Sequence, residues 1–408
     1  MSASGTELLP PSPIPTSTAS GARKWVYPRR MEGVLFQRRR VVAVLLIVLY
    51  SVLPHLTLNG MPAVLLDIPA RRFALFGVRF WPTDTLLLAL FGISVVVGIV
   101  TMTAVFGRVW CGWACPQTVY LEFVFRPIEH WLEGQGERQR KFDAAPWTRD
   151  KGVRKALKWF LYLLIAMFLA HTFLAYFVGV DRLRVWVTRS PIEHPLSFML
   201  MAGVTGAILF DFTWFREQMC TLACPYGRLQ SAMLDRATLR VTYDAARGEP
   251  RGKVQRGTLA AGEVKRGDCV DCTLCVQTCP TGIDIRNGFQ MECIGCTQCI
   301  DACEGVMLKL ERPSGLIRHT SPEALEGRKF RLFRPRLAVY GLVLTVLIST
   351  LVYKLETRHE VTVTVLRAVD APYQTLPDGW VSNHLKVRVS NRGTTDENFT
   401  ITLLEPAH

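Results

Sequence analysis

The sequence lacks the two glycine-rich patterns by which many enzymes bind nucleotides. No G-x-G-x-x-G follows a candidate strand, and no P-loop pattern occurs in the chain. The chain therefore shows no nicotinamide, flavin or ATP site of its own. Any electrons that it handles must come from one molecule and leave to another.

Charged residues are also scarce. They make up 20 % of the 408 residues, against 49 % hydrophobic residues, and the hydrophobic residues are gathered in long blocks. Because the first block starts only near Val41 and no small-residue cleavage site closes it, we expect no signal peptide. Five blocks are long enough to cross a bilayer as helices. They cover residues 41–58, 83–106, 159–180, 196–214 and 337–355.

The formal net charge of +14 is distributed unevenly between the segments that connect these blocks. Lys and Arg number seven in 23–40, ten in 107–158 and nineteen in 215–336, but three in 59–82, three in 181–195 and six in 354–408. Basic connecting segments stay in the cytoplasm, which predicts a cytoplasmic N-terminus and a periplasmic C-terminus. No nucleic-acid-binding motif accompanies the charge, so we expect no nucleic-acid partner.

The twelve cysteines are clustered rather than scattered, which favours metal ligation over a disulfide framework. Eight of them form two runs with the same x2, x2, x3 spacing. The first run contains Cys269, Cys272, Cys275 and Cys279, followed by Pro280, and the second contains Cys293, Cys296, Cys299 and Cys303.

This spacing is typical of a bacterial two-cluster ferredoxin. Three thiolates of each run hold one [4Fe–4S] cluster, and the fourth reaches the cluster of the other run. The first cluster is thus expected on Cys269, Cys272, Cys275 and Cys303, and the second on Cys293, Cys296, Cys299 and Cys279. Zinc is the alternative for paired C-x2-C units, but it does not require the third and fourth cysteines at this spacing twice over.

The other four cysteines form an internal repeat, F-x4-C-x2-A-C-P. It places Cys111 and Cys115 after the second apolar block and Cys220 and Cys224 after the fourth, both at the predicted cytoplasmic face. Residues at i and i+4 share one face of a helix, so each pair is expected to present two sulfurs together. Four soft ligands select Cu(I), zinc or an iron–sulfur cluster. The alternative is that they are small buried packing residues.

His55 and His171 lie within the first and third apolar blocks. Ionisable groups inside a membrane are candidates for function, so these two are possible haem or metal ligands. Neither lies in a local motif, and packing histidines are the alternative.

The remaining segments complete the predicted domain organisation. Residues 1–22, rich in Pro, Ser and Thr, are expected to be a disordered tail. Alternating apolar and polar residues predict β-strands in 356–408. Between them we predict a four-helix membrane domain (23–214), a cytoplasmic domain (215–336) with a ferredoxin fold at 260–312, and the fifth transmembrane helix (337–355).

Taken together, the two C-x3-C-P motifs, the double ferredoxin motif, the five blocks and the strand-rich tail resemble the CcoG family, also called FixG or RdxA. These are accessory proteins in the assembly of cbb3-type cytochrome c oxidase. The resemblance implies an α-helical membrane protein with five transmembrane helices, an inserted bacterial-type ferredoxin domain with two [4Fe–4S] clusters, and an immunoglobulin-like β segment in the periplasm. It places the chain in the bacterial inner membrane, with the ferredoxin domain in the cytoplasm.

The activity that the resemblance implies is reduction of Cu(II) to Cu(I). Cys111, Cys115, Cys220 and Cys224 would be the copper-handling catalytic thiols. The implied partners are a cytoplasmic electron donor and a copper chaperone or oxidase assembly factors. Two other functions fit the same motifs: a quinol-linked electron-transfer subunit of the NapH type, and a non-catalytic assembly scaffold or copper carrier.

Overall fold

The computed structural model describes most of the chain, with gaps in its terminal and connecting segments. The predicted disordered tail 1–22 lies outside the described residues apart from Thr16. The residues described are 16, 23–58, 60–68, 72–80, 84–253, 267–328, 334–357, 361–367, 373–377, 379, 381–382, 385–391 and 398–402.

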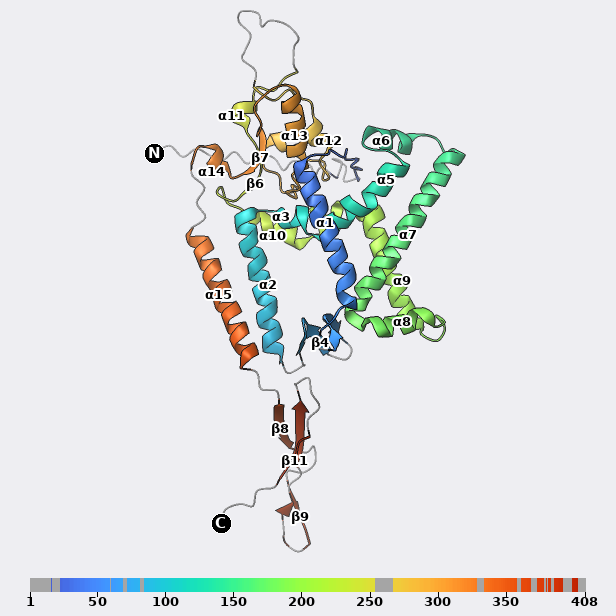
Figure 1. Ribbon diagram of the computed structural model, residues 1–408, viewed down its shortest axis with the longest axis vertical. Helices are drawn as coiled ribbons and strands as arrows, with labels where there is room; N and C mark the ends of the chain where they lie inside the picture. The colour runs from blue at the N-terminus through green and yellow to red at the C-terminus, as the bar shows by residue number, and fades with distance from the viewer. Residues whose placement is uncertain are drawn as a thin grey trace, which may run out of the picture.

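Long helices run between two ends of the molecule (Figure 1). The cysteine-rich segment lies at one end, and the C-terminal strands lie beyond the other. Within the described residues, four helices are long and apolar enough to cross a membrane, and they correspond to four of the five predicted spans. They are α2 (Thr85–Phe106), α7 (Arg149–Val178), α9 with its π-helical continuation η4 (Pro195–Phe215) and α15 (Pro335–Glu356).

The helix α1 (Val34–Val52) differs from the predicted first span, 41–58. It begins earlier, so Arg38, Arg39 and Arg40 lie inside it, and it ends where Pro54 enters the short helix η1 (Leu53–His55). Proline has no N–H to continue the α-helical bonding. Because of its arginines, α1 is not among the four membrane-length helices. The count of five spans therefore stays a prediction.

The first turn of α1 is attached to the cysteine-rich end. The backbone N–H groups of Leu35 and Phe36 donate to the Asp301 carboxylate at 3.2 and 2.7 Å. A carboxylate at this position satisfies free N–H groups and complements the positive end of the helix dipole. The helix α1 is thereby held against α13 (Gln298–Lys309), which carries Asp301.

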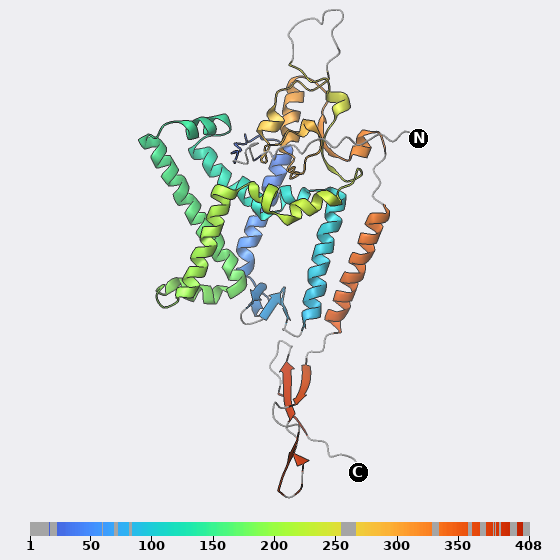
Figure 2. The same cartoon turned by 180° about the vertical axis from the view of Figure 1, so that it is seen from behind.

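A layer of short helices lies between the long helices and the cysteine-rich end (Figure 2). This layer carries both C-x3-C-P motifs. Its members are α3 (Val109–Trp113), α4 (Pro116–Tyr120), the π-helix η3 (Leu121–Phe125), α5 (Arg126–Leu132), α6 (Glu137–Ala144), the π-helix η5 (Met219–Ala223) and α10 (Pro225–Met233).

The cysteine-rich end has a ferredoxin-like arrangement that is wider than the predicted 260–312. The strands β6 (Arg240–Tyr243) and β7 (Ile317–Thr320) pair antiparallel outside those limits. Their inward side chains and those of Ile283, Ile285 and Met307 form a core with the cysteines. Between the strands lie α12 (Leu274–Gln277), η6 (Ile285–Asn287) and α13, and beside them α11 (Ala245–Gly248) and α14 (Pro322–Leu325).

Small sheets occupy the opposite end. Two of the predicted C-terminal strands are present as β8 (Val361–Arg367) and β11 (Leu385–Asn391), which pair antiparallel. The described residues 398–402 of the third carry no strand. The strands between α1 and α2 were not predicted from the sequence. Those strands are β1 (Thr57–Leu58), β2 (Met61–Pro62), β3 (Val64–Asp67), β4 (Arg72–Leu75) and β5 (Val78–Phe80). The remaining elements of this end are α8 (Val180–Thr188), β9 (Gln374–Thr375) and β10 (Val381–Ser382).

This arrangement makes the predicted topology testable. Arg140 in α6 and Arg312 after α13 lie toward the cysteine-rich end, whereas Arg184 in α8 and the C-terminal strands lie toward the other. Reporter fusions after Arg140 and Arg312 should report cytoplasm, and fusions after Arg184 and at the C-terminus should report periplasm. The excess of Lys and Arg in 107–158 and 215–336 is the physical reason. A cytoplasmic signal from the C-terminal fusion would contradict the five-span topology.

Candidate redox site: two cysteine cavities and a cysteine quartet

The eight cysteines of the double motif line two neighbouring cavities. The first cavity is bordered by Cys269, Cys272, Cys275 and Cys303, with apolar side chains such as Val306 and Leu316 completing its wall. The second is bordered by Cys279, Cys293, Cys296 and Cys299, and Cys275 also reaches its edge. The fourth cysteine of each run lies at the cavity of the other run.

The two runs follow the same backbone path. Asp271 and Gly295, each just before the second cysteine of its run, have φ of 51° and 68°. Thr273 and Thr297, each just after that cysteine, have φ of 57° and 63°. Such left-handed residues interrupt the regular backbone and can turn successive N–H groups toward one concave side, an arrangement common around iron–sulfur clusters. The repeated spacing therefore corresponds to a repeated local fold.

The chemistry of both cavities fits iron–sulfur clusters. Burial raises the pKa of Cys275, Cys296 and Cys303 to about 12 in each case. A buried thiol keeps its proton in apolar surroundings unless a metal ion takes the thiolate, so metal binding and proton release are coupled here. Four soft sulfur ligands in a largely apolar wall are the donor set that a [4Fe–4S] cluster requires.

The cysteines of the C-x3-C-P motifs lie on either side of helix breaks, so the expectation that each pair shares one helix face is wrong. Cys111 lies in α3, whereas Cys115 precedes α4 with extended backbone (φ −62°, ψ 127°). In the same way Cys220 lies in η5 and Cys224 precedes α10. The proline after each second cysteine is the cause, since it starts a new helix at its first position.

These four cysteines nevertheless form one group, which we call the cysteine quartet. Burial, together with the other thiolates of the quartet, Cys224 included, raises the pKa of Cys111, Cys115 and Cys220, in the last case to about 12. Within the described part of the chain, however, no three His, Cys, Asp or Glu side chains converge closely enough for a single metal ion. In this respect the quartet resembles the eight ferredoxin cysteines, which form no such three-residue group in that part of the chain either.

Each motif is held by residues that follow the other. Gln117, after the first C-P, donates from Nε2 to the Asp211 carboxylate at 3.2 Å and to the Arg216 carbonyl at 3.0 Å. Gln230, in the helix after the second C-P, is fully buried and accepts from Arg108 Nε at 2.8 Å. The Cys111 sulfur also lies 3.4 Å from Gln230 Oε1. These reciprocal contacts bring two helical hairpins, α1–α2 and α7–α9, which are far apart in sequence, to one site.

The quartet touches the second cavity directly. Cys111 packs in one apolar cluster with Ile294 and Cys296, and Cys220 lies at its edge. The backbones are so close that a Cβ on Gly112 would lie 2.8 Å from the Cys296 Cα. Only glycine permits this approach. The first C-x3-C-P motif and the loop of the second cavity are thus in backbone contact.

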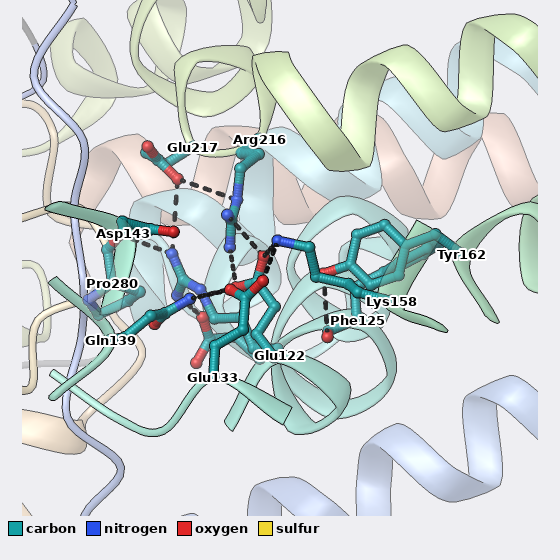
Figure 3. A network of polar contacts seen from close by, with 12 residues as sticks. Glu122, Phe125, Glu133, Gln139, Asp143, Lys158, Tyr162, Arg216, Glu217 and Pro280 are labelled. Carbon is teal, nitrogen blue, oxygen red and sulfur yellow. Dashed lines mark hydrogen bonds and ion pairs between the residues drawn. The ribbon is translucent and has the colours of Figure 1, made fainter. Parts of the chain in front are cut away.

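A buried network of charges joins the second motif to the segment that follows Cys279, another ligand of the second cavity (Figure 3). Arg216, four residues before Cys220, forms a two-bond pair with Glu129 at 3.0 and 2.8 Å. Arg126 contacts Glu217 at 3.5 Å and donates to the carbonyl of Pro280, next to Cys279, at 3.3 Å.

Glu129 is ionised inside this network. Burial alone would raise its pKa, but Arg216 and Lys158 lower it to about 2. This network was not predicted from the sequence, where its one signal is the charged pair Arg216–Glu217 between an apolar block and a cysteine motif.

The structure does not gather the two histidines into a larger group of ligands. His55 is exposed at the end of η1, and the Nδ1 of His171 lies 2.6 Å from the carbonyl oxygen of Met167. Among the described residues, neither belongs to a group of three potential metal ligands. Haem or metal ligation by His55 and His171 stays a prediction.

The membrane-length helices and the cysteine cavities define the class of this molecule: a membrane protein with a ferredoxin-type iron–sulfur domain. Comparison with known families agrees. A profile described as a 4Fe-4S dicluster domain matches residues 215–322, and a 4Fe-4S binding domain matches residues 88–134. A third profile, the IG-like fold at the C-terminus of FixG, matches residues 351–408. No solved structure matches the chain.

Relatives match the chain over most of its length. Protein RdxB of Cereibacter sphaeroides is 35 % identical, over 96 % of this chain and 84 % of the relative, and protein RdxA of the same organism is 34 % identical, over 92 % and 81 %. The nitrogen fixation protein FixG of Rhizobium meliloti is 32 % identical, over 93 % and 79 %. The chain belongs to the family of FixG, RdxA and RdxB, which confirms the resemblance seen in the sequence.

The cluster assignment predicts a definite iron content. Anaerobically purified protein should hold about eight iron and eight sulfide per chain in the two cavities. Replacing Cys279 by Ser should damage the second cluster more than the first, because Cys279 borders the second cavity. Metal analysis with EPR checks both statements, and finding zinc in place of iron would contradict them.

The charge network predicts a large loss of stability on removing one partner. Glu129→Gln should destabilise the protein by about 3–5 kcal/mol, because the buried Arg216 loses its two-bond partner and keeps only the longer contact with Glu217 at 3.9 Å. Glu137→Gln, which alters an exposed pair with Arg140, is the matched control and should cost less than about 1 kcal/mol.

The measurement is the unfolding midpoint in detergent, followed as a function of pH. The folded pKa of Glu129 is about 2 against an ordinary 4.5. The stabilisation is therefore complete above pH 4.5 and is lost as the pH falls toward 2. Equal midpoints for the two variants would show that the network is not needed for stability.

Proposed function

We propose that this protein is a membrane-bound iron–sulfur oxidoreductase that reduces Cu(II) to Cu(I) for the assembly of a cbb3-type cytochrome c oxidase. The contact between the cysteine quartet and the second cavity carries the proposal. Cys111 packs against Cys296, and Gly112 touches the backbone of the same loop. Four soft thiols thus lie next to the end of an electron-transfer chain.

The order of the sites along the molecule supports an electron path from solvent to the quartet. [4Fe–4S] clusters bound in the two cavities supply one-electron transfer, and reduction of Cu(II) to Cu(I) consumes one electron. Cys272 at the first cavity is exposed, whereas Cys296 at the second is buried beside Cys111. A cytoplasmic donor would therefore meet the first cavity, and the quartet would receive the electron from the second.

The ligands of the quartet favour the product, Cu(I), over the substrate, Cu(II). Thiolates are soft ligands and stabilise Cu(I) over Cu(II). Because no three of the four sulfurs converge closely enough for one metal ion, a single copper ion would engage some of them at a time or draw them together. On this proposal the protein lies in the bacterial inner membrane, takes electrons from a cytoplasmic donor, and passes Cu(I) to a copper chaperone or oxidase assembly factor.

A specific observation favours a second candidate. The quartet is spread as the cluster-binding cysteines are, and the 4Fe-4S binding domain match at 88–134 includes Cys111 and Cys115. The quartet would then hold a third iron–sulfur cluster, and the protein would conduct electrons to or from a quinol. A non-catalytic copper carrier or scaffold is the third possibility.

One experiment separates these functions. Anaerobic protein with reduced clusters is titrated with Cu(II) and followed optically and by EPR. Copper-dependent oxidation of the clusters is expected for the cupric reductase. Oxidation by a quinone but not by copper would favour the electron conduit, and clusters inert to both would favour the scaffold.

Replacing the quartet gives the sharpest mutational test. Changing Cys111 and Cys115, or Cys220 and Cys224, to Ser should leave the iron content unchanged, because the eight other cysteines supply the ligands of both clusters. Copper binding and Cu(II) reduction should fall together, since the hard oxygen of serine cannot replace a thiolate for Cu(I).

The outcome distinguishes one shared site from two. Loss of one pair should remove most of the activity if both pairs hold one ion, and about half if each pair holds its own. A loss of about four iron atoms per chain would instead assign a third cluster to the quartet. If all four can be replaced without loss of Cu(II) reduction, the motifs serve packing, and His55 and His171 become the residues to test.

A further inference from the structure

A buried arginine lies where the second cavity and the cysteine quartet meet. Of the three consecutive arginines of α1, Arg38 and Arg40 are exposed, whereas Arg39 is 0 % exposed. Its Nε donates to the carbonyl of Gly112 at 2.9 Å, between the two cysteines of the first motif. Gly112 in turn touches the Cys296 backbone. Arg39 therefore lies at the junction of the two redox sites.

The charge of Arg39 has no carboxylate partner within ion-pair distance among the described residues. Its two terminal nitrogens, Nη1 and Nη2, are buried and donate no hydrogen bond to any group in that part of the chain. The guanidinium also lies over the Phe123 ring, 5.3 Å from its centre. Arginine stays protonated in proteins, and a buried cation without an opposite charge is strongly destabilising. The site requires a counter-charge.

The nearest candidate for that charge is the ligand set of the second cavity. Burial raises the pKa of Cys296, and Arg39 is the strongest influence that lowers it. Burial lowers the pKa of Arg39, and Cys296 and Asp301 raise it in return. Asp301 is already bonded to the first turn of α1. A [4Fe–4S] cluster with four thiolates carries net negative charge, so it would compensate Arg39.

Two further arginines surround the same cavity. Arg108 and Arg240 both lower the pKa of Cys293, against the effect of burial. Arg108 bonds to neutral oxygens, among them Gln230 Oε1 at 2.8 Å, and Arg240 lies over the Phe289 ring at 4.5 Å. Like Arg39, neither forms an ion pair within the described segments of the chain. Three arginines without an ion pair among the described residues thus surround the second cavity.

The first cavity differs in this respect. Its neighbouring arginine, Arg286, is paired with two carboxylates, Asp271 at 2.5 Å and Asp284 at 2.7 Å. Burial and the neighbouring thiolates raise the pKa of Cys303, and Glu304, the next residue, contributes to the same rise. The positive charge near the first cavity is thus cancelled locally, although the two ligand sets are otherwise alike.

We propose that Arg39, supported by Arg108 and Arg240, is the counter-charge of the second cluster and makes it the electron acceptor of the pair. Reduction adds one negative charge to a cluster, and a nearby uncompensated cation stabilises the reduced form and raises its potential. With clusters held by the cysteines of the two cavities, one electron would pass from the first, which would be oxidised, to the second, which would be reduced, and no bond or proton would be transferred. Arg39 is a positioning and tuning residue, and the inference depends on the two clusters but not on copper.

The test is a redox titration of the full chain in detergent, without copper, followed by EPR. In Arg39→Gln, the reduced-to-oxidised ratio of one cluster at a fixed potential should fall at least tenfold, which is about 59 mV for a one-electron couple. Arg39→Lys keeps the charge without the Nε bond to Gly112 and should stay near the wild-type value. Arg38→Gln and Arg40→Gln, the exposed neighbours, are the matched controls and should change neither potential.

The shifted signal must belong to the second cluster. A Cys272→Ser variant perturbs the first cavity, so the component that responds to Arg39→Gln should be the one that this variant leaves intact. Unchanged potentials in an iron-replete Arg39→Gln protein, or a shift confined to the first cluster, would overturn the proposal. If the Arg39→Gln protein loses iron, Arg240→Gln is the deciding variant. Arg240 is half-buried, and on this proposal its replacement must also lower the potential of the second cluster.

Discussion

The close approach of two backbones at Gly112 and Cys296 is the contact on which the proposed function of this molecule depends. Electron transfer between two sites requires that they be near each other, and here a motif at the end of α2 meets a loop about 180 residues later in the chain without any side chain between them. The contact is maintained from both sides. Arg39 bonds to the Gly112 carbonyl, and Gln230 lies beside Cys111 and bonds to Arg108.

A contact of this kind needs a rigid support, and the buried charge network supplies it. Arg126 connects the layer of short helices to the loop after Cys279, and Arg216 connects the same layer to the second cysteine motif. Buried ion pairs gain little stability over apolar packing, but breaking one is costly. Such a network therefore specifies a single arrangement of the two hairpins and the iron–sulfur domain rather than adding to overall stability.

Local features could be predicted from the sequence, and features that join distant segments could not. The cysteine spacing predicted ligand groups that now border two cavities, because one short run determines a local fold. The four membrane-length helices followed from apolar length alone. The sharing of one helix face by Cys111 and Cys115 was predicted wrongly, because the rule of i and i+4 neglected the helix start that Pro116 imposes. The pairing of Glu129 with Arg216 joins residues 87 positions apart, and no periodic pattern in the sequence indicates it.

The three arginines of α1 show how one sequence feature can have two physical meanings. In the charge count they are three equal members of a basic segment that predicts a cytoplasmic N-terminus. In the structure, Arg38 and Arg40 are exposed and serve that purpose, whereas Arg39 is buried at the junction of the redox sites. The helical period decides the difference, since adjacent residues point about 100° apart and only one of three consecutive residues can face the core. The capping contact from Asp301 fixes the start of α1 against α13, and in the helix so placed it is Arg39, and neither neighbour, that bonds to the Gly112 carbonyl.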